Sequence, residues 1–107
     1  YYSNHYSNSL ESAERTAFVD AYKAEYNGEE PNGFAALAFD AANLALDALD
    51  RAGEPDAAKV DAAIFDTKDL KGVTGAVSFD DLHNAVKSAV VIELVDGVDA
   101  KATLINP

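Results

Sequence analysis

The sequence predicts an α/β protein with one strand, then three helices, then three strands. Three observations support this prediction. Between residues 10 and 65, apolar residues recur at the spacing of amphipathic helices. From residue 73 onward they alternate, or run together as β-branched residues, as they do in strands. Glycine and proline fall between these periodic segments and separate them.

The length and charge of the chain limit what it can be. Its 107 residues suit one small domain with a modest core. The formal net charge of -11 argues against binding to nucleic acid, which requires basic residues that neutralise phosphate. It also argues against an anionic membrane surface, which attracts polybasic segments. The acidity favours a protein that repels its own copies and stays dispersed.

The chain contains neither cysteine nor methionine. Without cysteine there are no disulfides, thiolate nucleophiles or cysteine-based zinc sites. Without methionine, Tyr1 is not a translation start, so we expect a chain that is mature, trimmed or cut from a longer protein. No apolar run approaches the ~20 residues of a membrane helix, and no signal peptide is visible.

The first strand and the first helix are predicted from aromatic and polar residues near the N-terminus. Tyr1–Tyr6 is expected to form a short strand, whose only possible partner strands come much later in the chain. Asn8 or Ser9 is expected to cap the helix that follows. This helix should end near Asn27, with Gly28 as its C-cap.

The second helix is predicted to start at Gly33, with Asn32 as its cap, and to stop at Gly53. Its apolar face should be buried and consists of Leu37, Ala38, Ala41, Leu44, Ala45, Ala48 and Leu49. Its solvent face should consist of Asp40, Asp47, Asp50 and Arg51. The many alanines permit close approach to a neighbouring helix or sheet.

A short third helix and three strands complete the prediction. Asp56 is expected to cap the third helix. Residues 73–80 alternate as a strand, and Val86–Val95 is predicted as one long β-branched strand. Asp96 and Gly97 form a strong hairpin signal before the last strand, residues 98–105.

No motif for catalysis or metal binding is present. His83 lies near two aspartates, but the spacing matches no EF-hand or zinc pattern, and we expect a solvated loop. Adjacent acids do not supply the different environments that a catalytic pair needs. The sequence therefore predicts no catalytic residue, no metal site and no cofactor.

Two phenylalanines of the second helix have different expected roles. Phe39 is expected in the core. Phe34 lies in the first turn beside Gly33, where free N–H groups suit an anionic ligand group or a buried carbonyl. For Phe34, a place in the core and a place in a ligand pocket both stay open.

Residues 18–53 read "FVDAYKAEYNGEEPNGFAALAFDAANLALDALDRAG". This stretch resembles the branched-chain amino-acid-type (type I) substrate-binding proteins of bacterial ABC transporters. That family often shows F-V-x-A-Y-K-x-x-Y-G-x-x-P, followed by a helix with A-A-x-A-Y-D-A. The matching residues are Phe18, Val19, Ala21, Tyr22, Lys23, Tyr26, Gly28 and Pro31, then Ala35, Ala36, Ala38, Phe39, Asp40 and Ala41. Asn27 is an extra residue, and Phe39 replaces the usual tyrosine.

The resemblance continues downstream and covers nearly the whole chain in order. "TKDLKGVTGAVSFD" is similar to the family's T-x-x-F-x-G-V-T-G-x-x-x-F-D, and "VKSAVVIELVDG" to the strand after it. The family's usual glycine after F-D is missing from "DDLHNA".

The resemblance implies the C-terminal portion of a two-lobed type I periplasmic-binding-protein fold that closes on a small ligand. Residues 1–85 would hold the crossing strand, the helices and an edge strand of the first lobe. Residues 86–107 would form the returning strands of the second lobe. The chain would then be the C-terminal third of a larger protein.

The resemblance also implies ligand-binding positions at Asn4, His5, Tyr6, Gly33 and Phe34. The implied function is capture of an amino-acid-like ligand and its delivery to a membrane permease, without any reaction. The protein would work in the periplasm or outside the cell, with or without a lipid anchor. Two alternatives are a ligand-sensing domain of a receptor or regulator with the same fold, and a free-standing α/β interaction domain.

Overall fold

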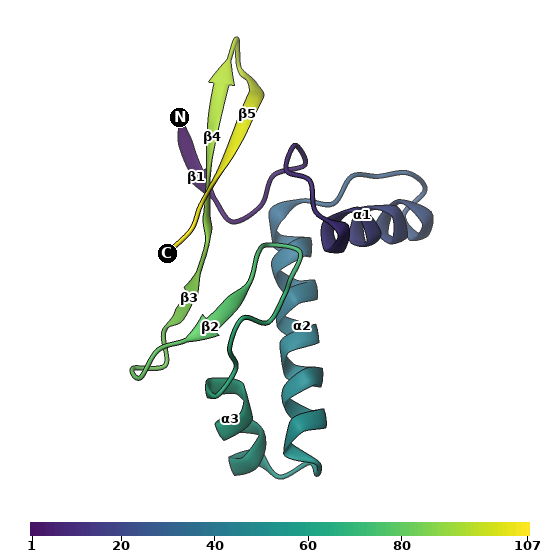
Figure 1. Cartoon of the computed structure of the whole chain (residues 1–107). Coiled ribbons are helices and arrows are strands. Elements are labelled where there is room, and N and C mark those ends of the chain that lie inside the picture. Colours follow the sequence, from purple (N-terminus) through teal and green to yellow (C-terminus); the bar gives the residue numbers. More distant parts are fainter.

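The computed structural model describes every residue from Tyr1 to Pro107. The element order is a strand, three helices and four strands, which confirms the predicted α/β order with one predicted strand divided in two. The molecule is elongated and measures 50 × 33 × 19 Å. A sheet lies at one end, α2 runs toward the other, and α1 projects to the side (Figure 1).

The larger sheet joins the two ends of the chain. Strands β1 (Tyr2–Asn4), β4 (Ala89–Val95) and β5 (Val98–Ile105) are antiparallel, in the order β1-β4-β5. Asp96 and Gly97 connect β4 to β5, both with positive φ (52° and 79°), as a type I′ turn requires. The predicted hairpin is therefore confirmed, and the N-terminal strand finds its partner in β4.

The smaller sheet corrects two strand predictions. It pairs β2 (Val77–Phe79) with β3 (Ala85–Lys87). The single strand predicted over Val86–Val95 is wrong, because Ser88 interrupts it and its two parts join different sheets. The strand predicted over 73–80 is shorter than expected, because residues 73 and 74 form a turn whose N–H groups bind a side chain of α2.

Helix α1 (Ala13–Glu25) begins later than predicted. Its N-cap is Ser12, whose hydroxyl accepts the Arg15 N–H at 3.1 Å, so the predicted caps at Asn8 and Ser9 are wrong. The carbonyls of residues 7 and 8 accept hydrogen bonds from the Arg15 guanidinium, which holds this segment outside the helix. The helix ends at Tyr26, so the predicted C-cap at Gly28 lies two residues too far along the chain.

Helices α2 (Gly33–Ala52) and α3 (Ala57–Phe65) form where the sequence predicts them. Asn32 and Asp56 are their N-caps, and Gly53 ends α2 with a positive φ of 74°. Each cap satisfies helix-end groups that would otherwise lack partners.

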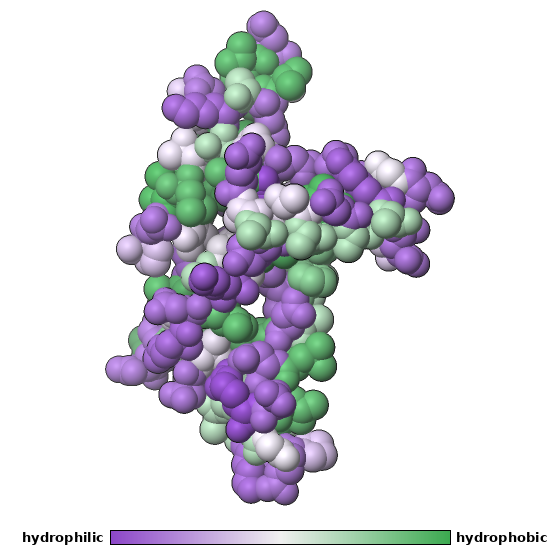
Figure 2. Space-filling model, turned by 45° about the vertical axis from the view of Figure 1, so that its right-hand side comes forward, coloured by the Kyte–Doolittle hydropathy of each residue, from purple (hydrophilic) through white to green (hydrophobic).

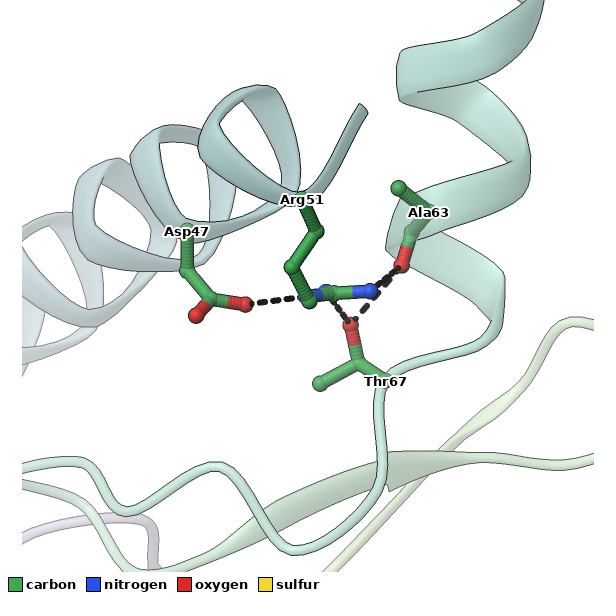
Figure 3. Close-up of polar contacts among 4 residues, drawn as sticks. All are labelled: Asp47, Arg51, Ala63 and Thr67. Atoms are coloured by element: carbon green, nitrogen blue, oxygen red, sulfur yellow. Dashed lines mark hydrogen bonds and ion pairs between the residues drawn. The ribbon is translucent and has the colours of Figure 1, made fainter. Parts of the chain in front are cut away.

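The C-terminal end of α2 is tied to α3 by one arginine (Figure 3). Arg51 Nε donates to Asp47 Oδ2 at 2.8 Å, and Arg51 Nη1 donates to the Ala63 carbonyl at 2.7 Å. Arg51 Nη2 donates to Thr67 Oγ1, also at 2.7 Å. Arg51 is exposed, as the sequence predicts, and it also joins the last turn of α2, the end of α3 and the loop that follows.

The buried core is small and lies where α1, α2 and the segment after β1 meet. Its packed cluster consists of Tyr6, Phe18, Ala36 and Val73, and Val90 and Ile92 of β4 are also buried. Phe39 contacts it through Phe18, with 4.8 Å between ring centroids, but is 44% exposed. Only 13 of 107 residues are buried, so most apolar side chains of this chain have a solvent-exposed side.

The predicted buried face of α2 is largely open, which corrects the sequence-based expectation. Of the predicted face, Ala48 is buried and Leu37 and Leu44 are half-buried, whereas four residues are exposed: Ala38, Ala41, Ala45 and Leu49. Figure 2 shows apolar surface along α2 and at the tip of the β4–β5 hairpin. None of the helices combines the length and apolarity needed to cross a membrane.

Candidate functional site

The segment after β1 and the first turn of α2 meet closely. A Cβ atom built on Gly33 would lie 3.5 Å from Asn4 Oδ1 and 3.8 Å from Tyr6 Cβ. These are ordinary van der Waals distances, so the start of α2 lies directly beside Asn4 and Tyr6. Three of the five positions named from the sequence therefore come together in the fold.

The first turn of α2 offers backbone donors next to this contact. Asn32 Oδ1 accepts the Ala35 N–H at 3.0 Å. The amides of Gly33 and Phe34 have no partner within the helix, as in the first turn of every α-helix. The helix N-terminus carries a partial positive charge, and the side chain of Asn4 lies beside it.

Tyr6 lines this contact, but its side chain does not offer a free polar group. Its side chain is 4% exposed and belongs to the core. Its hydroxyl donates to Asn8 Oδ1 at 2.7 Å. Burial raises the pKa of Tyr6, while the positive charge of Arg15 acts in the opposite direction. The phenol is therefore neutral at physiological pH, and its hydroxyl already has a partner.

Phe34 and His5 lie outside the core of this chain. Phe34 is 84% exposed, so a place in this core is wrong for it, and its ring stands open at the start of α2. His5 is exposed, and its backbone N–H donates to Asn4 Oδ1 at 2.8 Å. Neither side chain is enclosed by the residues of this chain.

A cavity of about 270 Å³ lies beside the segment that follows β1. Its walls come from residues 5–7, the start of α1, residues 71–76 and the strands β4 and β5. Arg15 lines it and is 6% exposed. Its guanidinium donates to the Ser7 carbonyl at 2.6 Å and lies 5.8 Å from the centre of the Tyr6 ring. Arg15 thus holds the chain after β1 against α1.

Sequence reasoning missed two polar residues that organise this region, Arg15 and Asp40. The sequence predicts Asp40 on the solvent face of the second helix and gives Arg15 no role, because helical periodicity alone does not distinguish a solvated charge from one that binds a distant loop. In the structure, the Asp40 carboxylate accepts the Val73 and Thr74 N–H groups, which corrects this prediction. For Asp40 one signal existed, the family-like A-F-D-A segment in which an aspartate follows the aromatic residue.

The loop that contains His83 is held together by hydrogen bonds between its own residues. Asp80 accepts hydrogen bonds from the Leu82 and Asn84 N–H groups at 2.9 and 2.8 Å, and its hydrogen bonds to Asn84, more than any other contact, lower the pKa of Asp80. The exposed His83 ring stacks on Phe65, with 3.7 Å between centroids. No group of three or more potential metal-ligating side chains is positioned to hold an ion.

Comparison with protein families identifies the class of this chain. Residues 1–99 match the periplasmic binding protein family, and the chain belongs to that family. Its fold is a portion of the type I periplasmic-binding-protein fold. A search of curated proteins finds no match.

Solved structures similar to this chain are substrate-binding proteins. A leucine binding protein from Thermotoga maritima MSB8 is 33% identical, with a TM-score of 0.82 over 98% of this chain and 30% of that protein. A branched-chain amino acid transporter substrate binding protein from Streptococcus pneumoniae, in complex with isoleucine, is 40% identical, with a TM-score of 0.84 over 98% and 30%. A solute binding protein of an ABC transporter from R. palustris, in complex with benzoate, is 26% identical, with a TM-score of 0.76 over 97% and 28%.

These similarities confirm the resemblance seen in the sequence. The relatives are ABC transporter substrate-binding proteins, of which the first two are of the branched-chain amino-acid type. The chain spans about 30% of the length of the first two relatives.

Proposed function

We propose that this chain is the C-terminal third of the solute-binding component of an ABC importer. The complete protein captures a small amino-acid-like ligand between two closing lobes and delivers it to a membrane permease, without carrying out a reaction. The similarity to substrate-binding proteins of ABC transporters, which extends over 98% of the chain, carries this proposal.

In this proposal, the ligand-binding positions of the chain are Asn4, His5, Tyr6, Gly33 and Phe34. The contact between Asn4 and Gly33 supports it, because it places a side-chain amide beside the free N–H groups of a helix start. The exposed Phe34 ring also supports it, because an aromatic side chain at a cleft covers the apolar part of a ligand. The polar groups fix the orientation of the ligand, and the ring provides apolar contact.

In this proposal, the two lobes of the complete protein divide this chain into residues 1–85 and residues 86–107, with β1 as the crossing strand that pairs with β4. The change of sheet at Ser88, between β3 and β4, supports a division in this region. The apolar face of α2 is open in this chain. This supports the proposal that the remainder of the same chain packs against it in the first lobe. The protein captures its ligand in the periplasm or outside the cell, and it is either free or attached by a lipid.

Isothermal titration calorimetry of the full-length gene product tests this function, with L-leucine, L-isoleucine and benzoate as probes. We expect a dissociation constant of about 1 μM or lower for at least one amino acid, a free energy of about -8 kcal/mol. Residues 1–107 alone should bind none of the probes, because most polar ligand contacts come from other segments. Micromolar binding to residues 1–107 alone, or no binding to the full-length protein, contradicts the proposal. A transmembrane or effector segment after Pro107 favours a sensing domain instead.

A further inference from the structure

The carboxylate of Asp40, in the middle of α2, binds the loop that precedes β2. Asp40 Oδ1 accepts the Val73 N–H at 2.7 Å. Asp40 Oδ2 accepts the Thr74 N–H at 2.8 Å and the Thr74 hydroxyl at 2.7 Å. Hydrogen bonds to an ionised acceptor are about twice as strong as those between neutral groups. Both carboxylate oxygens therefore fix the loop to the helix.

The neighbouring glycine is required by this contact. A Cβ atom at Gly72 would lie 2.7 Å from Asp40 Cγ and 2.7 Å from Oδ2, distances that real Cβ atoms do not show. Only a glycine lets the backbone of the loop lie against the carboxylate. Positions 40 and 72 are far apart in the sequence, but the carboxylate at position 40 requires the absence of a side chain at position 72.

A lysine from β3 extends the contact to a third element. Lys87 Nζ donates to Thr74 Oγ1, and the same hydroxyl donates to Asp40 Oδ2. Burial lowers the pKa of Lys87, while the charge of Asp40 acts to raise it. We call Asp40, Gly72, Val73, Thr74 and Lys87 the Asp40 clamp.

The Asp40 clamp lies where the chain passes from one sheet to the other. Ser88, which separates β3 from β4, directly follows Lys87. A Cβ atom at Gly75, where φ is 104°, would lie 3.6 Å from Ser88 Cβ. Ser88 Oγ donates to Asn106 Oδ1 at 3.0 Å, just beyond β5. Contacts thus run from α2 through the loop to the three-stranded sheet, and Figure 1 shows this loop between α2 and the strands.

We propose that Asp40 is a positioning residue, which sets the orientation of α2 relative to the three-stranded sheet through Thr74 and Lys87. The first turn of α2 carries Gly33 and Phe34, and the sheet carries Asn4 at the end of β1. Their relative placement therefore depends on the clamp. Its importance for ligand binding rests on the proposed function, whereas its effect on orientation is measurable without any ligand.

Amide hydrogen exchange in the ligand-free, full-length protein tests the contact itself. In Asp40→Asn, the amide has one acceptor oxygen, and its NH₂ group faces a donor. We expect the Val73 and Thr74 amides to exchange at least about tenfold faster, because their protection depends on this acceptor. Asp50→Asn removes the same charge from an exposed position of the same helix and should leave these rates unchanged.

Spin-label distances test the orientation. This chain has no cysteine, so labels at Asp61→Cys on α3 and Lys101→Cys on β5 report the placement of the helices relative to the sheet. We expect the distance distribution to shift or broaden in Asp40→Asn. Thr74→Val keeps the side-chain shape but removes the hydroxyl, and it should have a similar effect, whereas Thr74→Ser should restore the wild-type distribution.

Calorimetry with L-isoleucine then connects orientation to binding. Asp40→Asn and Thr74→Val should weaken binding by about tenfold, or 1.4 kcal/mol, whereas Thr74→Ser and Asp50→Asn should bind as the wild type does. Wild-type distances in Asp40→Asn and Thr74→Val overturn the positioning role, whatever the affinity. If the wild type binds no probe, the proposed function fails, but the amide exchange rates and the spin-label distances still test the positioning role of the Asp40 clamp. If Asp40→Asn does not fold, the distances in Thr74→Val and Thr74→Ser test this role instead.

Discussion

At its C-terminal end, α2 is tied to the rest of this chain by side-chain contacts, whereas at its N-terminal end it meets mainly the segment after β1. The last turn has Arg51, with three hydrogen-bond partners, and Gly53 as a left-handed cap. The first turn contacts Asn4 and Tyr6 and leaves Phe34 exposed. The polar groups of the last turn have partners within the chain, whereas the first turn leaves free N–H groups and an exposed ring.

This difference distinguishes the end of α2 that stabilises the fold from the end that carries the candidate ligand-binding site. The polar side chain of Arg51 at the closed end has its partners, so a change of this residue should act on stability. The open end presents free N–H groups and an exposed ring, so changes there should act on binding. Between them, the Asp40 clamp connects the helix to the sheet. Three predictions test this comparison, from the largest expected effect to the smallest.

The largest effect concerns the open apolar side of α2 in the isolated chain. Residues 1–107 alone should self-associate, because the exposed residues Phe39, Leu46 and Leu49 lie on this helix without cover. Analytical ultracentrifugation at increasing concentration measures this, and the full-length gene product serves as the control that should stay monodisperse. A monomeric residues 1–107 that melts cooperatively would contradict the prediction and show that the open side needs no cover.

At the closed end, Arg51→Ala should lower the free energy of unfolding by about 2 kcal/mol, because it leaves the Ala63 carbonyl and Thr67 hydroxyl without a charged donor. Urea denaturation of the full-length protein measures the change. Affinity for L-isoleucine should stay the same in this variant. The matched control is Lys59→Ala, which removes a positive charge from α3 at an exposed ion pair and should cost less than about 1 kcal/mol.

At the open end, Phe34→Ala should change the free energy of unfolding by less than about 0.5 kcal/mol, because the ring is 84% exposed. Its affinity for L-isoleucine in the full-length protein should fall by about tenfold, or 1.4 kcal/mol. Leu82→Ala removes an apolar side chain that is 81% exposed in a distant loop, and it should affect neither quantity. A large loss of stability without a loss of affinity in Phe34→Ala would place this ring in a core and not in a cleft.

Features that depend on a few consecutive residues were predictable from the sequence. Asn32, Gly53 and Asp56 end or begin helices as expected, because a cap bonds only to the adjacent turn. The hairpin at Asp96 and Gly97 follows from backbone conformations that these residues adopt easily.

Features that depend on distant partners were not predictable in this way. Ser88 lies inside the stretch Val86–Val95 that the sequence predicts as one strand, and only the pairing of β3 with β2 and of β4 with β1 divides this stretch. The start of α1 moved to Ser12 because Arg15 binds the carbonyls of residues 7 and 8. Of the candidate site, the sequence indicated Asn4, Tyr6 and Gly33 through resemblance, but not that they touch.

The sequence by itself determined the α/β order, the caps of α2 and α3, the hairpin and the family resemblance, because these depend on local conformational preferences and on a motif order that can be read along the chain. Only the tertiary structure decided that Asp40 is half-buried and bound to a loop, that the strand changes sheets at Ser88, and that one side of α2 is left open. The physical reason is that a charge or an apolar face acquires its role from the groups that lie against it, and these come from segments far away in the sequence.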